Sequence, residues 1–411
     1  MKSIIIAVAG YNLAETSRMV EIAKEAKKFF NIIFISYGGK FEDMIDELNF
    51  ERIKLEPQLT TKKLKNLQKV LTGDKINTLA YFNESEIEER VKSEINILKK
   101  IKPAAVITGW NLTVGLSSRI LKIPFVNVLH STSIKEYYEN GLQSYPDWID
   151  STIISKIFSK EKIESRFNKR IINSDVAVKL YNKVGKKYGL KPFKSFIDFI
   201  EGDIVLLADI PEWVGHKTIR NNFYFIGPLP ARLNIPIPEK IKNIKKDKPI
   251  VFFAMGSSGK SSLIVNIIEG FRDKQYKVIA PVSNHIKGLI QDIPENVIIT
   301  DFIPADKVNK IADVAIIHGG QNTVMNTCLS ETPFVGIGMH AEQQANIDAC
   351  VRKGFAIRLS KKLVTSEDVL NSIDKLINDD EAKKNIKIFS NQLKKMNGPV
   401  EATNILKKYY E

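Results

Sequence analysis

Cysteine is scarce in this chain, which has only two, Cys328 and Cys350, in 411 residues. Two thiols cannot frame the disulfides of a fold this large, and they lack the spacing of a zinc site. Both stand among apolar neighbours in segments that we expect to be helical, where cysteine usually acts as a small buried hydrophobe. The scarcity therefore excludes a disulfide scaffold and is typical of a reducing compartment.

Long apolar runs are also missing. No stretch approaches the roughly 18 apolar residues that a membrane-spanning helix needs. The N-terminus, MKSIIIAVAGYN, has only a short apolar run and no small-residue cleavage pattern of a signal peptide. We therefore expect a cytoplasmic globular protein, and the length of the chain favours two domains over one.

The rhythm of apolar runs and helical segments predicts two α/β domains. Strand, helix and strand follow one another over 4–9, 16–29 and 32–37, and residues 103–128 repeat the pattern. Further strands are expected near 204–208, 250–254, 277–281, 297–300, 314–317 and 334–336. A stretch rich in proline and lysine separates the two halves. We predict two doubly wound Rossmann-like domains facing a cleft: an N-terminal acceptor domain over 1–235, a linker over 236–248, a C-terminal nucleotide-sugar domain over 249–395, and a helix over 396–411 that crosses back.

The segment 301–354 holds the most informative motif. The apolar run 314–317 predicts a strand, and His318-Gly319-Gly320 turns it into a helix from Gln321 on. Glycine lets the backbone approach a ligand, and the N–H groups at a helix start favour a diphosphate. Asn322 and Thr323 add side-chain donors. The turn therefore predicts a phosphate-binding site.

A second apolar run, 334–337, precedes Glu342 and Gln343, a carboxylate and an amide that suit sugar hydroxyls. With the segment Phe302-Ile303-Pro304 upstream, the ordered motifs resemble the UDP-glycosyltransferase superfamily, whose members are inverting two-domain enzymes of the GT-B fold (glycosyltransferase family 1-like). The run YFIGP at 224–228 and the turn at Gly256-Ser257 resemble further family signatures.

The resemblance implies a donor site for a nucleotide-diphosphate sugar that needs no cofactor, and we expect a UDP-sugar. It implies diphosphate contacts at His318, Gly319, Gly320, Asn322 and Thr323, sugar contacts at Glu342 and Gln343, a border to the base at Phe302 and Ile303, and a donor-side turn at Gly256 and Ser257. Asn326 stands where many members have a ribose-binding glutamate. Because no D-x-D pair stands at a strand end, we expect a site without metal and a diphosphate stabilised by these donors.

The general base is where the chain departs from the family. Aligning Arg18 with the family's G-H-x-x-R pattern puts Glu15 where the catalytic histidine stands. A buried carboxylate with a raised pKa accepts protons near neutrality, whereas a glutamate in a first helical turn also stabilises the helix. His130, after the strand at 123–128, is the second candidate. The missing histidine leaves open a catalytically silent nucleotide-sugar-binding or partner protein.

A rival motif lies at 254–261, where AMGSSGKS fits a loose P-loop with Lys260 and Ser261 at the phosphate and magnesium positions. A nucleoside triphosphatase is therefore an alternative, but it leaves the segments around His318 and Glu342 unexplained. We favour a glycosyltransferase that acts on a small-molecule or lipid-linked acceptor.

The formal charge of +14 is concentrated in part at 156–194, which contains twelve Lys or Arg against three acids. Such a block suits an anionic membrane surface, and we expect peripheral membrane association as one possibility. A solvated basic face is the simpler alternative. Nucleic acid is the weakest of the three, since no RNA-binding module is visible.

Overall fold

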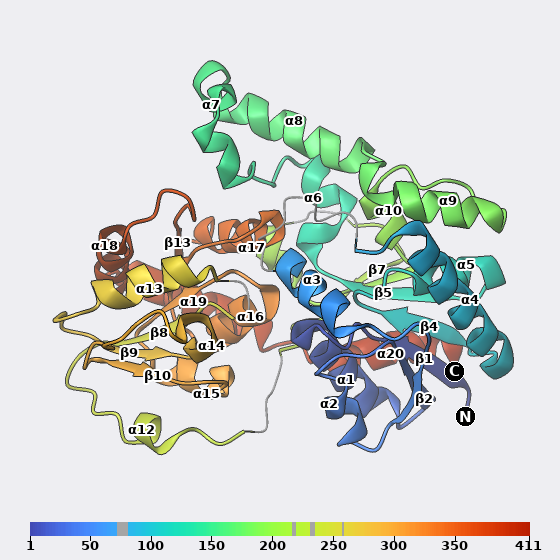
Figure 1. Ribbon diagram of the computed structural model, residues 1–411, viewed down its shortest axis with the longest axis horizontal. Helices are drawn as coiled ribbons and strands as arrows, with labels where there is room; N and C mark the ends of the chain where they lie inside the picture. Colours follow the sequence, from blue (N-terminus) through green and yellow to red (C-terminus); the bar gives the residue numbers. More distant parts are fainter. Residues whose placement is uncertain (72–80, 216–218, 231–234, 257–258) are drawn as a thin grey trace.

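The computed structural model describes residues 1–71, 81–215, 219–230, 235–256 and 259–411. Within this part, two parallel β-sheets flanked by helices form two α/β domains side by side (Figure 1). The predicted fold class is confirmed. In the same described part, no helix is both long and apolar enough to cross a bilayer.

The first sheet has the strand order β3-β2-β1-β4-β5-β6-β7, and every pair is parallel. Its central strands are apolar runs buried along their length, as expected where helices cover both faces of a parallel sheet. The strands are β1 (Ser3–Ala7), β2 (Asn31–Ser36), β3 (Glu51–Lys54), β4 (Ala105–Thr108), β5 (Phe125–Leu129), β6 (Ile204–Leu207) and β7 (Phe223–Phe225).

The helices of the first domain are α1 (Leu13–Ala26), α2 (Asp43–Asp46), α3 (Thr61–Leu71), α4 (Glu84–Ile101), α5 (Val114–Leu121), α6 (Lys135–Glu139), α9 (Lys179–Lys187), α10 (Phe196–Ile200) and α11 (Pro211–Val214), with the short turns η1 (Ser131–Ser133) and η3 (Val176–Val178). Helix α1 starts three residues before the predicted position 16, because the Asn12 side chain accepts the N–H groups of Ala14 and Glu15 at 3.1 and 3.3 Å. Glu15 consequently lies in the first helical turn.

The second sheet has the order β10-β9-β8-β11-β12-β13. Its strands are β8 (Ile250–Ala254), β9 (Lys277–Ala280), β10 (Val297–Ile299), β11 (Val314–Ile317), β12 (Phe334–Gly336) and β13 (Ala356–Arg358). Its helices are α13 (Ser261–Gly270), α14 (Ser283–Ile286), α15 (Ala305–Val308), α16 (Gln321–Leu329), α17 (Ala341–Val351), α18 (Ser366–Ile377) and α19 (Asp380–Leu393), with η4 (Asn309–Ile311).

The chain crosses between the domains twice. Residues 226–249, which include α12 (Glu239–Lys242), lead from β7 to β8. The last helix, α20 (Gly398–Tyr410), returns to the first domain and packs against α1, where Leu406 joins the core of the first sheet (Figure 1). The hydroxyl groups of Tyr409 and Tyr224 lie 2.5 Å apart and fix the helix end.

An arm interrupts the first domain between the neighbouring strands β5 and β6. It consists of η2 (Asp147–Ser151), α7 (Ile153–Ile157) and α8 (Lys160–Asn173). Figure 1 shows α7 and α8 standing away from both sheets. The inner side of α8 is anchored by Asn168, whose amide donates to the carbonyl oxygen of Gln143 at 2.8 Å.

Candidate functional site

The carboxyl ends of strands from both domains meet at a common seam. Helix α16 follows β11 of the second sheet, and its first two side chains reach the first domain. Gln321 donates to the carbonyl oxygen of Ala208, after β6, at 3.0 Å, and Asn322 donates to that of Ala14 at 3.2 Å. The predicted phosphate-binding turn therefore faces the start of α1, which carries the candidate base Glu15.

The turn between β11 and α16 depends on its glycines. A Cβ atom at Gly320 would lie 2.4 Å from Nε2 of His318, and one at Gly256 would lie 2.8 Å from Cε1 of the same ring. Gly319 has φ +82°, and a Cβ there would meet the backbone oxygen of Gln343 at 2.6 Å. The imidazole of His318 is thus held between two glycines from two strand ends. Ser257, predicted beside Gly256, lies outside the described residues.

The imidazole of His318 is nearly buried and neutral. Burial lowers its pKa to about 4. Its Nδ1 lies 3.4 Å from the carbonyl oxygen of Ala254, an arrangement in which Nδ1 carries the proton. Nε2 then carries the lone pair and gains a proton only if an anion arrives beside it. Thr323 is half-buried in the first turn of the same helix, and Asn326 is buried one turn further on.

A chain of polar contacts joins α17 to the first domain. Thr132 donates to Oδ1 of Asn346 at 3.0 Å, and the amide of Asn346 donates to Oε1 of Glu342 and to the carbonyl oxygen of Gly319, both at 3.1 Å. Burial raises the pKa of Glu342. Gln343 is buried, and its Oε1 accepts the N–H of Met339 at 2.8 Å. That oxygen holds the turn before α17, so Glu342 is the more available of the two predicted sugar contacts.

The segment predicted to border the base divides between surface and core. Ile303 is buried, while the Phe302 ring is exposed and lies under the ammonium group of Lys40, 4.8 Å from the ring centroid. Lys40 belongs to the first domain, so this cation–π contact also crosses the seam. A flat, solvent-facing ring beside a cation is suited to a nucleotide base.

Glu15 is fully buried, and both of its carboxylate oxygens accept backbone N–H groups. Oε2 accepts from Ala9 at 2.9 Å, and Oε1 accepts from Gly109 and Trp110 at 3.2 and 3.3 Å. Burial raises the pKa of Glu15 to about 7, and these three donors together with Arg18 oppose that rise. Glu15 therefore ties the loop after β1 to the loop after β4, and Oε2 retains a lone pair.

Arg18 lies between the second candidate base and the donor turn. Its guanidinium Nη1 lies 2.8 Å from Nε2 of His130 and donates to Oε1 of Gln321 at 3.3 Å. Burial, and then the charge of Arg18, hold the pKa of His130 well below its ordinary value. His130 is therefore neutral at neutral pH and is placed beside Glu15's helix, although sequence reasoning treated the two as alternatives.

Two features of this seam escaped the sequence analysis. Asp209, after β6, accepts the N–H and hydroxyl of Ser131, both at 2.8 Å, and burial raises its pKa to about 7. Trp110 packs edge-to-face on Tyr81 and Phe196, with ring centroids 5.9 and 6.0 Å apart. A carboxylate just after a predicted strand at 204–208 was a usable signal for Asp209, whereas the aromatic cluster joins residues too distant in sequence to be predicted together.

Comparisons with known proteins show the family and the fold of the chain. The family model described as UDP-glucoronosyl and UDP-glucosyl transferase matches residues 92–402. A PGL/p-HBAD biosynthesis glycosyltransferase of Mycobacterium tuberculosis is 22% identical over 303 residues, which cover 72% of this chain and 68% of the relative. Glycosyltransferase VinC, solved in complex with DTDP, superposes with a TM-score of 0.71 at 13% identity over 99% of both chains. Spinosyn rhamnosyltransferase SpnG, solved with spinosyn aglycone, gives 0.69 at 11% identity over 99% of this chain and 100% of the other.

Proposed function

This chain belongs to the UDP-glucoronosyl and UDP-glucosyl transferase family, and on that premise we propose that it is an inverting glycosyltransferase whose donor is a UDP- or dTDP-sugar. Its acceptor is a hydroxyl group on a small-molecule or lipid-linked compound. The glycosyltransferase activity itself is the property of the family and of the named relatives, whereas donor, acceptor and stereochemistry are our proposals.

The observation that carries the proposal is the His318 imidazole between Gly256 and Gly320 at the start of α16. The helix start offers unpaired N–H groups and partial positive charge, and His318 adds a donor once it is protonated. A leaving diphosphate gains negative charge as the sugar departs, so these groups stabilise the transition state more than the ground state. The N–H groups at the start of α16 and the His318 imidazole thus stabilise the charge of the diphosphate without a metal ion.

Proton transfer on the acceptor side is assigned to Glu15. The acceptor oxygen attacks the anomeric carbon as the bond to the diphosphate oxygen breaks, and the hydroxyl proton passes to Oε2 of Glu15. A pKa of about 7 suits a base that works near neutral pH. Because Glu15 is fully buried, an acceptor reaches Oε2 only after the loops around Tyr11 and Trp110 shift. Those aromatic side chains favour an acceptor with an apolar aglycone.

Calorimetric titration of UDP and dTDP tests the donor site. Gly320→Ala places a methyl group against the His318 ring, and His318→Ala removes the imidazole. Each variant should weaken nucleotide binding roughly 10- to 100-fold. Gly185→Ala is the matched control, because a Cβ there makes only ordinary contacts of 3.5 Å with Leu116 and Leu190. Unchanged affinity in both site variants would remove the donor assignment.

A catalytically silent nucleotide-sugar-binding protein is the second candidate, and the three backbone N–H groups that Glu15 accepts favour it, because they suit a carboxylate that only anchors two loops. Donor hydrolysis or transfer by the purified chain decides between the two. The assay is run with excess chelator: persistence of turnover supports the proposed site, whereas a strict need for magnesium returns attention to the P-loop-like segment at 254–261.

A further inference from the structure

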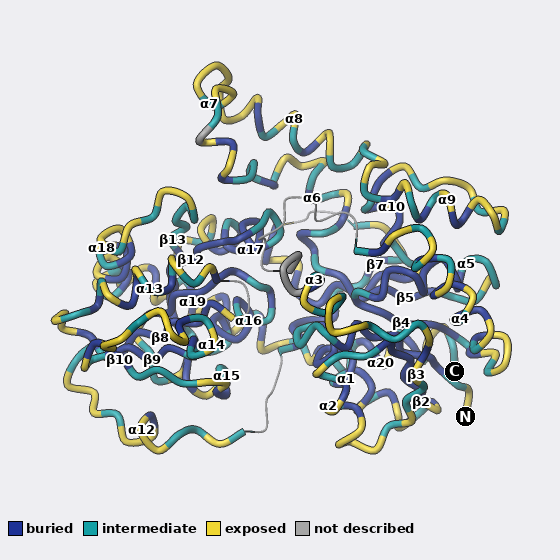
Figure 2. The backbone as a smooth tube through the Cα atoms, viewed as in Figure 1, coloured by how far each residue is buried: buried dark blue, intermediate teal, exposed yellow. Residues whose placement is uncertain are grey.

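The tip of the arm exposes an apolar cluster that the glycosyltransferase site does not use. Ile153 and Ile157 of α7 are 70% and 64% exposed, and Ile154, Phe158 and the preceding Trp148 are exposed as well. No residue of α7 is buried. Neighbouring exposed aliphatic side chains are unfavourable in water and mark an interaction surface. Figure 2 shows this end of the arm as exposed backbone far from the interdomain seam.

A row of cations runs along α8 beside the apolar cluster. Lys162, Arg166 and Lys169 stand at spacings of four and three residues, so they share one face of the helix, and all three are exposed. The Arg166 guanidinium lies 4.9 Å from the centroid of the Phe158 ring. The cationic row and the apolar cluster therefore lie on the same side of the arm.

Two cations of the α8 row, Lys162 and Lys169, differ in their ion pairing from Lys183 and Lys187 of the same basic block at 156–194. On α9, Lys183 and Lys187 form ion pairs of 2.6 to 3.5 Å with Glu84 and Glu88 of α4. Within the described residues, Lys162 and Lys169 have no acidic partner at ion-pair distance. The segment 153–173 carries six Lys or Arg and two Glu. The arm therefore has a net positive charge, and Lys162 and Lys169 contribute to it.

We propose that the arm docks on an anionic lipid bilayer, with the α7 cluster (Trp148, Ile153, Ile154, Ile157 and Phe158) at the boundary between headgroups and acyl chains and the α8 row (Lys162, Arg166 and Lys169) on lipid phosphates. A bilayer surface supplies an apolar layer directly beneath a layer of negative charge, which matches both features. This inference is independent of the proposed reaction.

Other occupants fit the surface less well. Single-stranded nucleic acid stacks its bases on aromatic rings, whereas Ile153, Ile154 and Ile157 make the cluster mainly aliphatic and the Phe158 ring already faces Arg166. A second copy of this chain, related by a two-fold axis, would bring the two cationic rows together. The bilayer is the partner that complements the aliphatic cluster and the charge at once.

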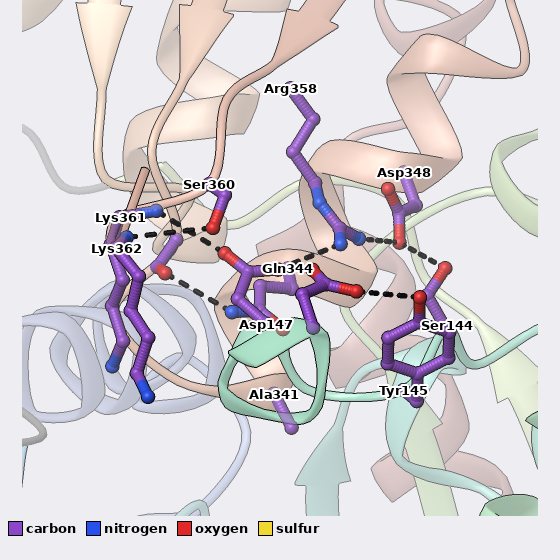
Figure 3. A network of polar contacts seen from close by, with 12 residues as sticks. Ser144, Tyr145, Asp147, Ala341, Gln344, Asp348, Arg358, Ser360, Lys361 and Lys362 are labelled. Atoms are coloured by element: carbon purple, nitrogen blue, oxygen red, sulfur yellow. Dashed lines mark hydrogen bonds and ion pairs between the residues drawn. The ribbon is translucent and has the colours of Figure 1, made fainter. Parts of the chain in front are cut away.

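The root of the arm is bonded to the second domain. Asp147 accepts the guanidinium of Arg358 at 2.9 Å, and Ser144 donates to Asp348 of α17 at 2.6 Å, as Figure 3 shows. Arg358 and Asp348 belong to the second domain, while Asp147 begins the arm. An arm docked on the bilayer is therefore bonded to the second domain as well as to the first.

Co-sedimentation of the full-length chain with vesicles tests the proposal. The chain should bind vesicles of equimolar phosphatidylcholine and phosphatidylglycerol, bind phosphatidylcholine alone at least about 10-fold more weakly, and dissociate as salt is raised. Only three tryptophans occur in the chain, and the exposed Trp148 should shift its emission to the blue on binding.

Two double or triple variants divide the surface. The apolar variant combines Ile153→Ser with Ile157→Ser, and the charge variant combines Lys162→Gln, Arg166→Gln and Lys169→Gln. Each should lower vesicle binding at least about 10-fold without changing thermal unfolding. Lys183→Gln with Lys187→Gln on α9, and Ile388→Ser at an exposed site on α19, are the matched controls. Equal binding to neutral and anionic vesicles, wild-type binding by both arm variants, or binding to RNA or to a second copy in place of vesicles would each overturn the proposal.

Discussion

Nη1 of the Arg18 guanidinium lies 2.8 Å from Nε2 of His130, and this Nη1 also donates to Oε1 of Gln321 in the other domain. One buried cation therefore joins the loop after β5 to the start of the helix that is proposed to hold the diphosphate. Burial, and then the charge of this neighbouring cation, hold the pKa of His130 well below its ordinary value, so the ring is neutral and able to accept a hydrogen bond.

Replacing Arg18 by methionine should raise the pKa of His130, although burial will still hold it below the ordinary value. The ring resonances of His130 in an NMR pH titration measure the change, and the chain has only five histidines to assign. Arg272→Met removes an exposed arginine far from the seam and serves as the control. A His130 titration that is the same in both variants would show that the contact does not set its protonation.

Nucleotide binding should be coupled to uptake of a proton by His318. Burial holds the pKa of the free imidazole at about 4, and a neighbouring diphosphate raises it. The protonated form is favoured in the complex, so affinity should fall as pH rises from about 4 through the higher pKa of the bound state. Calorimetry in two buffers of different ionisation enthalpy counts the proton. His318→Asn should bind without proton uptake, and uptake that persists in this variant would assign the proton to another group.

The sequence predicted the central strands of both sheets because each is an apolar run buried on both faces. It missed β3, β7 and β13, which are only three or four residues long and contain half-exposed residues, such as Arg52 of β3 and Arg358 of β13. So short a strand gains its pairing from the sheet, and its own residues carry little signal.

The donor turn was predictable because its chemistry is local: His318, Gly319 and Gly320 are consecutive, and their conformation follows from residue type. The surroundings of Glu15 were not, since its donors come from Ala9, Gly109 and Trp110, which the fold brings together. The apolar cluster on α7 was missed because its residue types predict the wrong environment. Isoleucines in sequence indicate burial, and only the structure places Ile153 in solvent.

Glu15→Gln should lower turnover about 10²- to 10⁴-fold and remove an ionisation near pH 7 whose deprotonated form is active. The same raised pKa affects stability. Between about pH 4.5 and 7 the unfolded chain releases this proton and the native chain keeps it. The free energy of unfolding of the wild type should therefore fall as the pH rises through that window. Steady-state kinetics and urea unfolding at several pH values measure the two effects.

The control for Glu15 has to separate catalysis from loop anchoring, because an amide at position 15 loses backbone partners too. Glu94 is a second buried carboxylate of the same domain, bound by Tyr37, Thr113 and Ser117. Glu94→Gln should affect stability yet leave the pH dependence of turnover unchanged. If Glu15→Gln turns over within a few-fold of wild type, Glu15 is an anchor only, and His130 or an unassisted acceptor carries the proton.

Arg358→Met should destabilise the chain by about 3 to 5 kcal/mol, because it leaves the carboxylate of Asp147 buried without its cation. Asp147 is only 1% exposed, and in this variant it keeps two neutral donors, the N–H of Lys361 at 3.3 Å and the hydroxyl group of Ser360, but no cation. Asp147→Asn combined with Arg358→Met removes the unpaired charge and should recover most of the loss. Arg272→Met, which breaks exposed ion pairs, should cost much less than Arg358→Met, because solvent screens these pairs. Urea unfolding gives the four stabilities. An Arg358→Met variant as stable as Arg272→Met would mean that Asp147 reaches water when its partner is lost, and that the arm root is not fixed to the second domain through this pair.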